Sequence, residues 1–122
     1  MHVETRPKPG LADFRLRQLD AFINERLGTP VRLAEMAALL PMSPFHFCRV
    51  FKLSTGLTPK AYVDDRRMRE AQRLLANTAM PVSRIARHVG YRSPSHFTER
   101  FRKHSAMTPS EYRRRVFYAP PG

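Results

Sequence analysis

The chain lacks the features that mark secreted, membrane-spanning and metal-cage proteins. It has a single cysteine, Cys48, so it can form neither a disulfide within the chain nor a cysteine-based metal cage. No apolar run approaches the roughly 20 residues of a membrane span. Residues 1–10 carry charges and two prolines instead of the apolar stretch of a secretory signal. These absences predict a protein without membrane association in a reducing, cytoplasmic setting.

Acidic residues are also scarce. The 122 residues include 10 Asp and Glu against 22 Lys and Arg, which gives a net charge of +12, and 18 of the 22 basic residues are arginine. The excess is concentrated in residues 79–122, which hold nine basic and two acidic side chains. A surface of this kind predicts a polyanionic partner, and arginine suits bidentate contacts with phosphate and guanine.

Signatures of catalysis are missing from the sequence. It has no glycine-rich phosphate loop, no cluster of metal ligands and no nucleophile placed beside a base. His46 and His96 are the candidate metal ligands, but they fall in separate lobes and no acidic cluster accompanies them. The sequence therefore predicts no enzyme, no cofactor and no metal site.

An internal repeat organises the chain. Residues 43–62 align without gaps on residues 93–112 at an offset of 50, and eight of the 20 aligned positions are identical. The identical pairs are Ser43/Ser93, Pro44/Pro94, His46/His96, Phe47/Phe97, Phe51/Phe101, Thr58/Thr108, Pro59/Pro109 and Tyr62/Tyr112. Upstream the match continues at an offset of 49, so Pro41 stands opposite Gly90. Such a repeat predicts two similar lobes.

The local signals in each lobe are helical. Ser-Pro and Thr-Pro pairs supply helix N-caps followed by proline at the first helical position, and Thr108 with Glu111 fits a capping box. Gly28, Gly56 and Gly90 follow helix ends, where a left-handed residue is often needed. We predict an all-α fold whose seven helices cover residues 11–27, 33–40, 44–54, 59–77, 81–89, 94–104 and 109–117. The expected division is an N-terminal arm (1–10), a first helix-turn-helix lobe (11–57), a linker helix (58–78), a second lobe (79–117) and a tail (118–122).

Helical periodicity separates a buried face from a free face in the second helix of each helix-turn-helix. Phe47, Val50 and Phe51 form one stripe, and Phe97 with Phe101 repeats it. The opposite side carries Phe45, Arg49 and Lys52 in the first copy and Ser95, Glu99 and Arg102 in the second, with Cys48 and Thr98 on the flanks. An aromatic ring such as Phe45 pointing away from the core predicts a partner such as a thymine methyl group.

These motifs resemble the DNA-binding domain of the AraC/XylS family of bacterial transcription regulators over about residues 11–117. The specific runs are SPFHFCRVFK and GLTPKAY in the first copy and VGYRSPSHFTERFRK and MTPSEYR in the second. The resemblance implies that each lobe inserts its second helix into one of two successive major grooves. It places base contacts at Phe45, His46, Cys48, Arg49, Ser95, His96, Thr98 and Glu99. Pro41 replaces a Gly-like turn residue of the family, and Glu99 stands where a basic or small polar residue is common.

Further expectations concern partners and phosphate contacts. A linker helix of about 18 residues is about 27 Å long, so two lobes could reach grooves about 34 Å apart on an asymmetric double-stranded DNA site as a monomer. Phosphate contacts are expected from Lys52, Arg100, Arg102 and Lys103, and RNA polymerase is a further expected partner. Glu99 is expected either to accept from a cytosine amino group or to pair with a nearby cation. Relatives commonly carry a sensor or dimerisation domain, so the chain is either a stand-alone regulator or part of a longer one.

Some alternatives stay open on sequence alone. A basic RNA-binding protein is the main rival function. Arg66, Arg67, Arg69 and Arg73 are expected mostly on a solvated face, with Asp64, Asp65 and Glu70 as partners. The run of Arg113, Arg114 and Arg115 is either a phosphate clamp or a solubilising end.

Overall fold

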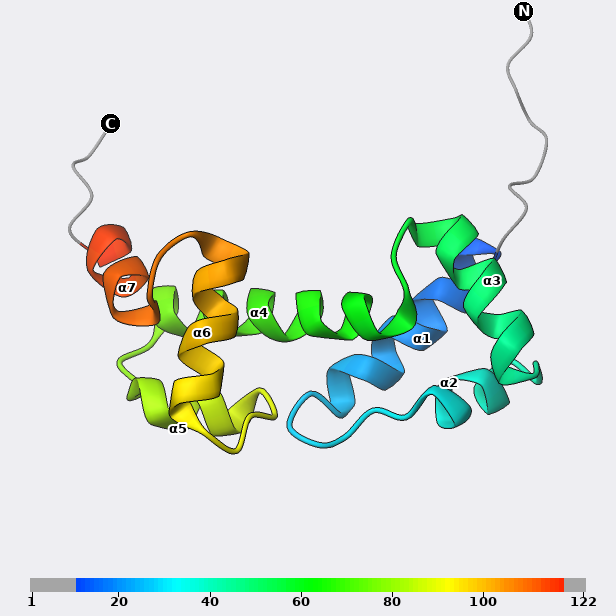
Figure 1. Ribbon diagram of the computed structural model, residues 1–122, viewed down its shortest axis with the longest axis horizontal. Coiled ribbons are helices and arrows are strands. Elements are labelled where there is room, and N and C mark those ends of the chain that lie inside the picture. Colours follow the sequence, from blue (N-terminus) through cyan, green and yellow to red (C-terminus); the bar gives the residue numbers. More distant parts are fainter. Residues whose placement is uncertain (1–10, 118–122) are drawn as a thin grey trace, which may run out of the picture. The chain divides into compact units, whose positions relative to one another are not determined.

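The computed structural model describes residues 11–117, which form seven helices and no strand (Figure 1). The helices are α1 (Asp13–Glu25), α2 (Leu33–Leu39), α3 (Pro44–Thr55), α4 (Pro59–Asn77), α5 (Val82–His88), α6 (Pro94–Ser105) and α7 (Pro109–Phe117). The predicted all-α class is confirmed, and each predicted helix is present within two residues at either end. Within this part of the chain, no helix combines the length and apolar character needed to cross a membrane.

The predicted start signals act as helix caps. Backbone N–H groups of His46 and His96 donate to the Oγ atoms of Ser43 and Ser93 at 3.2 and 3.3 Å. The capping box at α7 is complete, because the Glu111 N–H donates to Thr108 Oγ1 at 3.1 Å and the Thr108 N–H donates to Glu111 Oε1 at 2.8 Å. These bonds satisfy N–H groups that a helix start leaves unpaired.

Two of the three predicted left-handed glycines are confirmed. Gly56 ends α3 at φ 80°, and Gly90 follows α5 at φ 96°. The prediction for Gly28 is wrong, because α1 already ends at Glu25 and Gly28 lies outside the left-handed region. At the end of α6 the position equivalent to Gly56 is Ala106, which adopts φ 64° without being glycine.

The described residues divide into two compact units. The first contains residues 11–25 and 31–63, and the second contains residues 26–30 and 64–117. The division falls inside α4, between Val63 and Asp64, and the loop after α1 belongs to the second unit. The lobe and linker boundaries expected from the sequence stay a prediction about how the chain is organised.

The core of the first unit is built from α1, α2 and α3. Leu19, Ile23, Phe47 and Phe51 are fully buried, and α2 packs against α3. The Phe47 and Phe51 rings lie 5.4 Å apart, and the ring of Tyr62 meets Phe51 edge-on at 5.0 Å. This core fixes which side of α3 is turned away from the protein.

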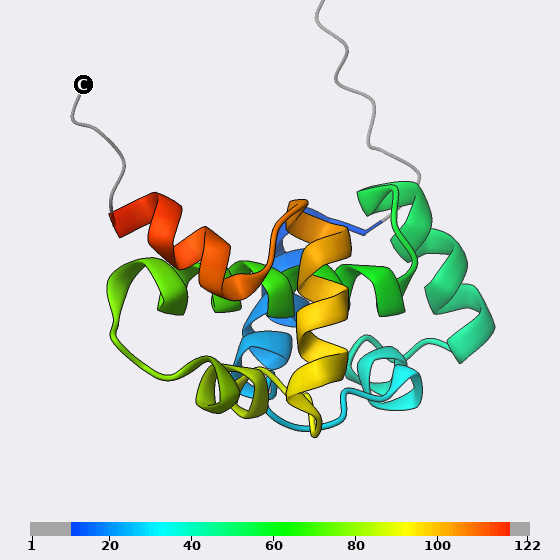
Figure 2. The same ribbon diagram turned by 60° about the vertical axis from the view of Figure 1, so that its left-hand side comes forward.

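The second unit repeats this core with α4, α5, α6 and α7. Phe97 and Phe101 are fully buried with ring centroids 5.8 Å apart, and Tyr112 meets Phe101 edge-on at 5.6 Å. In Figure 2, α5 lies beside the N-terminal half of α6, and α7 continues from the C-terminal end of α6. The predicted packing role of the repeated phenylalanines is therefore confirmed, and the two repeated tyrosines pack against them.

Two arginines hold backbone carbonyls inside the second unit. Arg67 donates from Nε to the Leu27 carbonyl at 3.2 Å and from Nη2 to the Thr29 carbonyl at 2.8 Å. Arg113 donates to the carbonyls of Leu75 and Thr78, each at 3.1 Å. Both side chains satisfy acceptors at or beyond a helix C-terminus, which the helix itself leaves unpaired.

Of the four α4 arginines expected mostly on a solvated face, Arg69 and Arg73 behave as predicted, whereas Arg66 and Arg67 are half-buried. Arg69 pairs with Asp65 at 2.9 Å, and Arg73 pairs with Glu70 at 2.7 Å. Both arginines are largely exposed, so solvent screens each pair and neither contributes much to stability. The hydrogen bond from Arg73 also lowers the pKa of Glu70 below its ordinary value, against a smaller opposing effect of burial.

Candidate nucleic-acid interface

The outward side of α3 is free of the core. Phe45 is 76% exposed, and His46, Arg49 and Lys52 are exposed as well. Cys48 is half-buried at the edge of this side. We call Phe45, His46, Cys48 and Arg49 the first reading face, and the structure brings all four to one side of the N-terminal part of α3. No ion pair or side-chain hydrogen bond within residues 11–117 occupies Arg49 or Lys52.

A groove borders the first reading face. It has a volume of about 610 Å³ and is lined by Cys48, Arg49, Lys52, Leu53, Gly56, Thr58 and Pro59. Leu53 is 56% exposed, although it is apolar. The groove therefore combines two unpaired cations with an apolar wall, a combination suited to a sugar–phosphate strand.

The outward side of α6 carries a different set of side chains. Ser95, His96 and Glu99 are exposed and Thr98 is half-buried; we call these four the second reading face. Arg102 and Lys103 are exposed on the following turn. The ring of His96 meets Tyr91 edge-on at 5.3 Å, which restrains one member of this face.

The arginine, lysine and histidine side chains in the C-terminal half of α6 fall into two groups. Arg100 donates to Asp64 Oδ2 at 3.1 Å and keeps 42% of its side chain exposed, and His104 Nε2 lies 2.9 Å from Asp65 Oδ1. Arg102 and Lys103 have no such partner within the described part of the chain. The acidic pair on α4 therefore engages one flank of α6 and leaves the other flank available to an anion.

Glu99 stands without a partner among residues 11–117. The pair with Arg100, Arg102 or Lys103 that helical spacing allows is not formed. A carboxylate on an otherwise basic face is therefore available as an acceptor. The expected ion pair of Glu99 is therefore wrong within the described residues, and the contact with a cytosine amino group stays a prediction.

The carboxylate of Asp64 also acts on Tyr91, in the turn before α6. Burial raises the pKa of the Tyr91 hydroxyl above its ordinary value, and the negative charge of Asp64 raises it further, while Arg100 opposes both effects. Tyr91 therefore stays neutral through the physiological range.

The turns that precede the two reading helices share one hydrogen bond and differ in backbone conformation. The N–H of Met42 donates to the Ala37 carbonyl at 3.0 Å, and the N–H of Tyr91 donates to the Ala86 carbonyl at 2.9 Å. Pro41 nevertheless has φ 21°, far from the value near −65° that its ring favours. The equivalent residue in the second unit is Gly90, whose φ of 96° lies in the region that favours glycine.

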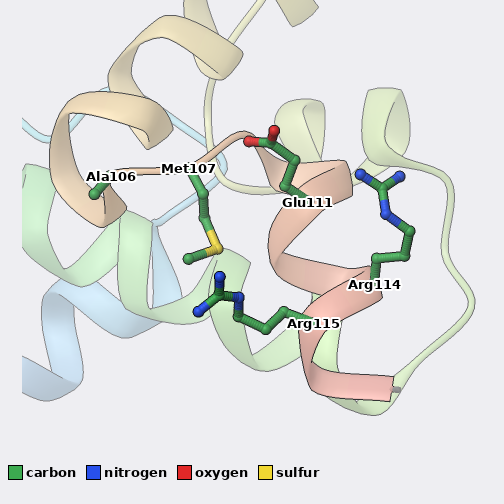
Figure 3. Close-up of a pocket in the computed structure, with 5 residues that line it drawn as sticks. All are labelled: Ala106, Met107, Glu111, Arg114 and Arg115. Carbon is green, nitrogen blue, oxygen red and sulfur yellow. The ribbon is translucent and has the colours of Figure 1, made fainter. Parts of the chain in front are cut away.

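A second hollow lies on α7, away from the residues predicted for base contact. It has a volume of about 560 Å³ and is lined by Ala106, Met107, Glu111, Arg114 and Arg115. In Figure 3, Arg115 extends toward Met107, whereas Arg114 projects from another side of α7. Hydrogen bonds from Thr108 lower the pKa of Glu111 below its ordinary value, so this carboxylate is committed to the helix cap.

The three arginines of this run have different roles. Arg113 is structural, because it holds the carbonyls of Leu75 and Thr78. Arg114 and Arg115 are exposed and form no ion pair or side-chain hydrogen bond in the described residues, although the charge of Arg114 helps to lower the pKa of Glu111. Only the last two remain candidates for a phosphate contact.

Sequence reasoning missed the residues that fasten α6 and the α1–α2 loop. Arg67, Asp64 and Asp65 act across 36 to 40 residues of sequence, and no local spacing signals such contacts. Residues 11–117 contain no group of three or more His, Cys, Asp or Glu side chains able to hold a metal ion.

Comparison with known proteins decides the family. A family model described as "Helix-turn-helix domain" matches residues 36–115. A DNA-binding transcriptional regulator of AraC type from Chromobacterium violaceum has a similar structure, with a TM-score of 0.80 and 27% identity over 88% of this chain and 95% of that one. The chain belongs to the AraC/XylS family of DNA-binding domains. This is a family of DNA-binding regulators and not of enzymes.

Other AraC/XylS members agree with this assignment. The DNA-binding domain of the transcription factor AdpA, solved in complex with a target DNA, superposes with a TM-score of 0.78 and is 30% identical over 88% of this chain and 98% of that one. The lactose operon transcription activator of Staphylococcus xylosus is 35% identical over 92 residues, 75% of this chain and 33% of that protein. The arabinose operon regulatory protein of Escherichia coli is 28% identical over 83% of this chain and 35% of that protein. The chain thus spans about a third of these curated relatives, and none of these comparisons supports the RNA-binding alternative.

Proposed function

We propose that this AraC/XylS domain regulates transcription by reading an asymmetric double-stranded DNA site with α3 and α6 in two successive major grooves. The observation that carries the proposal is the pair of outward helix faces, each rigidly capped and each free of the core. The two faces differ in every residue except the shared histidine. Two unequal readers fit an asymmetric site, whereas a palindrome fits a symmetric dimer.

Base contacts in this proposal come from the first and second reading faces. Arg49 reads guanine, since a free guanidinium can donate to O6 and N7 together. Phe45 supplies apolar contact, and Cys48, His46, His96, Ser95 and Thr98 complete the two surfaces. These residues lie in the N-terminal halves of α3 and α6, the part of a recognition helix that contacts base edges.

Phosphate contacts in this proposal come from the cations that flank the two faces. Lys52, Arg102 and Lys103 are exposed and form no ion pair or side-chain hydrogen bond with any residue between 11 and 117. Arg100 is the fourth contact, with a contribution reduced by its bond to Asp64. The wider proposal includes a cytoplasmic location, a monomeric domain, a contact with RNA polymerase and a sensor or dimerisation domain elsewhere in a longer protein.

Selection of bound duplexes from a random DNA pool tests the proposal. We expect an enriched motif with two different halves about one helical turn apart. Binding to the selected duplex should weaken with salt at a slope of about −3 to −4 in log K against log salt, because three to four phosphates are neutralised at roughly −0.9 each. Lys52→Ala should make this slope shallower by about 0.9, and Arg73→Ala, which removes a cation paired on α4, serves as the control. A palindromic motif, tighter binding to structured RNA or a flat salt response would contradict the proposal.

A further inference from the structure

The two reading helices are built on the same local pattern of caps and buried rings, so their exposed residues can be compared position by position. Both begin at a capping serine with bonds of 3.2 and 3.3 Å, and both end in a left-handed residue. Both bury a phenylalanine pair against the edge of a tyrosine. Residues 50 positions apart therefore hold the same place on the two helices.

The exposed residues at these shared places differ in chemistry. Phe45 corresponds to Ser95, and Cys48 corresponds to Thr98. Further along, Leu53 corresponds to Lys103. Each of these three positions is apolar or weakly polar on α3 and carries a hydroxyl or an ammonium group on α6. The two helices thus offer different surfaces to DNA, one apolar beside Arg49 and one hydrogen-bonding beside Glu99.

The exposure of Phe45 calls for an apolar partner. At 76% exposure the ring makes little contact with the core, and its neighbour Cys48 lines the adjacent groove. In a major groove the C5-methyl of thymine is the apolar group that base pairs present. Serine at the matching place on α6 has no comparable apolar surface to give such a methyl group.

We propose that the two helices read chemically different half-sites: α3 recognises thymine methyl groups through Phe45 and Cys48, and α6 recognises hydrogen-bonding edges through Ser95, Thr98 and Glu99. The inference rests on the proposed function, since it assigns the DNA chemistry of the same two faces. Removing a methyl group at the α3 half-site should therefore weaken binding, and removing one at the α6 half-site should not.

Replacement of thymine by deoxyuridine tests this, because it deletes the C5-methyl and leaves the hydrogen-bonding edge unchanged. Each thymine of the selected duplex is replaced singly, and the affinity of the full 122-residue chain for each duplex is measured. We expect a loss of about fourfold for each contacted methyl, the value of one buried CH₂ group. These losses of affinity should cluster in the half-site that α3 contacts.

The Phe45→Ser variant, which places the α6 residue at the matching position of α3, tests whether the Phe45 ring causes the loss of affinity on deoxyuridine substitution. In Phe45→Ser the deoxyuridine substitutions should become neutral, while binding to the duplex persists at reduced affinity. The ring is exposed, so its loss should leave the fold intact, which circular dichroism and thermal unfolding check. Phe14→Ala is the matched control, because Phe14 is 58% exposed on α1 outside both reading faces and should leave the deoxyuridine losses unchanged.

Several results would overturn the inference. The inference fails if deoxyuridine leaves the affinity unchanged throughout the site, or if it lowers the affinity equally in both half-sites. It also fails if the losses of affinity persist in Phe45→Ser. Each of these results would leave sequence-specific binding in place. Failure of the pool to yield any enriched duplex would instead overturn the proposed function. The two failures are therefore distinguishable.

Discussion

The turn before α6 predicts a large difference between two glycine-to-alanine substitutions. Gly56 and Gly90 both have positive φ, at 80° and 96°. A Cβ at Gly56 would meet nothing within 4 Å, whereas a Cβ at Gly90 would lie 2.6 Å from the Leu27 carbonyl oxygen and 3.2 Å from Arg67 Nε. Both substitutions therefore strain the backbone, but only Gly90→Ala also brings a Cβ into collision with the Leu27 carbonyl.

The magnitudes follow from these contacts. Left-handed backbone costs an alanine roughly 1–2 kcal/mol, offset by about 0.4–1 kcal/mol from the more restricted unfolded chain. Gly56→Ala should then cost about 1 kcal/mol or less, as the natural left-handed Ala106 suggests. Gly90→Ala must also displace the Leu27 carbonyl from Arg67, which adds about 1–2 kcal/mol for the lost hydrogen bond and repacking.

Urea unfolding followed by circular dichroism measures both variants. We expect Gly90→Ala to lower the free energy of unfolding by about 2–3 kcal/mol with an unchanged m-value, and Gly56→Ala to lie close to the parent. Combining Gly90→Ala with Arg67→Met should give less than the sum of the two losses, because both break the same contact. Equal costs at the two glycines would refute the close approach at Gly90.

Three further outcomes follow from the same structure. Arg49→Ala should relax base preference at one position by about 1–3 kcal/mol of discrimination in a pool selection, and equal weakening on all duplexes would make Arg49 a phosphate contact. Glu99→Gln should change the preferred base at one position of the α6 half-site, and a large uniform gain in affinity would show simple repulsion. Glu111→Gln should destabilise the domain at neutral pH. Because folding lowers the pKa of Glu111, its contribution is present above the ordinary value of 4.5 and is lost as the pH falls through the lower folded value, so the two proteins should converge in acid unfolding curves.

Local signals explain why the helices could be predicted. Serine or threonine before proline marks the starts of α3, α6 and α7, and these signals need no knowledge of distant residues. The repeated phenylalanine spacing identified the buried stripes, and hence the free faces of α3 and α6. The prediction of a left-handed conformation at Gly28 is wrong because α1 ends three residues earlier, and a glycine in a loop can adopt many conformations.

Contacts between distant segments explain what the sequence could not supply. Helical spacing allows Glu99 to pair with Arg102, but an exposed pair of this kind is worth only a few tenths of a kcal/mol, so spacing does not compel it. The partner that Arg100 does find, Asp64, lies 36 residues earlier and on another helix. Whether a cation faces DNA or another helix is thus settled by packing, which periodicity on one helix cannot reveal.

The net charge of +12 therefore overstates the charge available to phosphates. Arg67 and Arg113 are directed at backbone carbonyls, and Arg69, Arg73 and Arg100 are bonded to carboxylates. These bonds do not remove the long-range attraction of a basic domain for DNA, which depends on the total charge. They do fix which guanidinium groups can form short contacts, and those contacts determine register and base choice. In this domain several arginines thus fasten backbone carbonyls or α4 carboxylates of the second unit, and only Arg100 among them ties a proposed reading helix, α6, to α4. The proposed phosphate contacts therefore depend mainly on the other cations of α3 and α6.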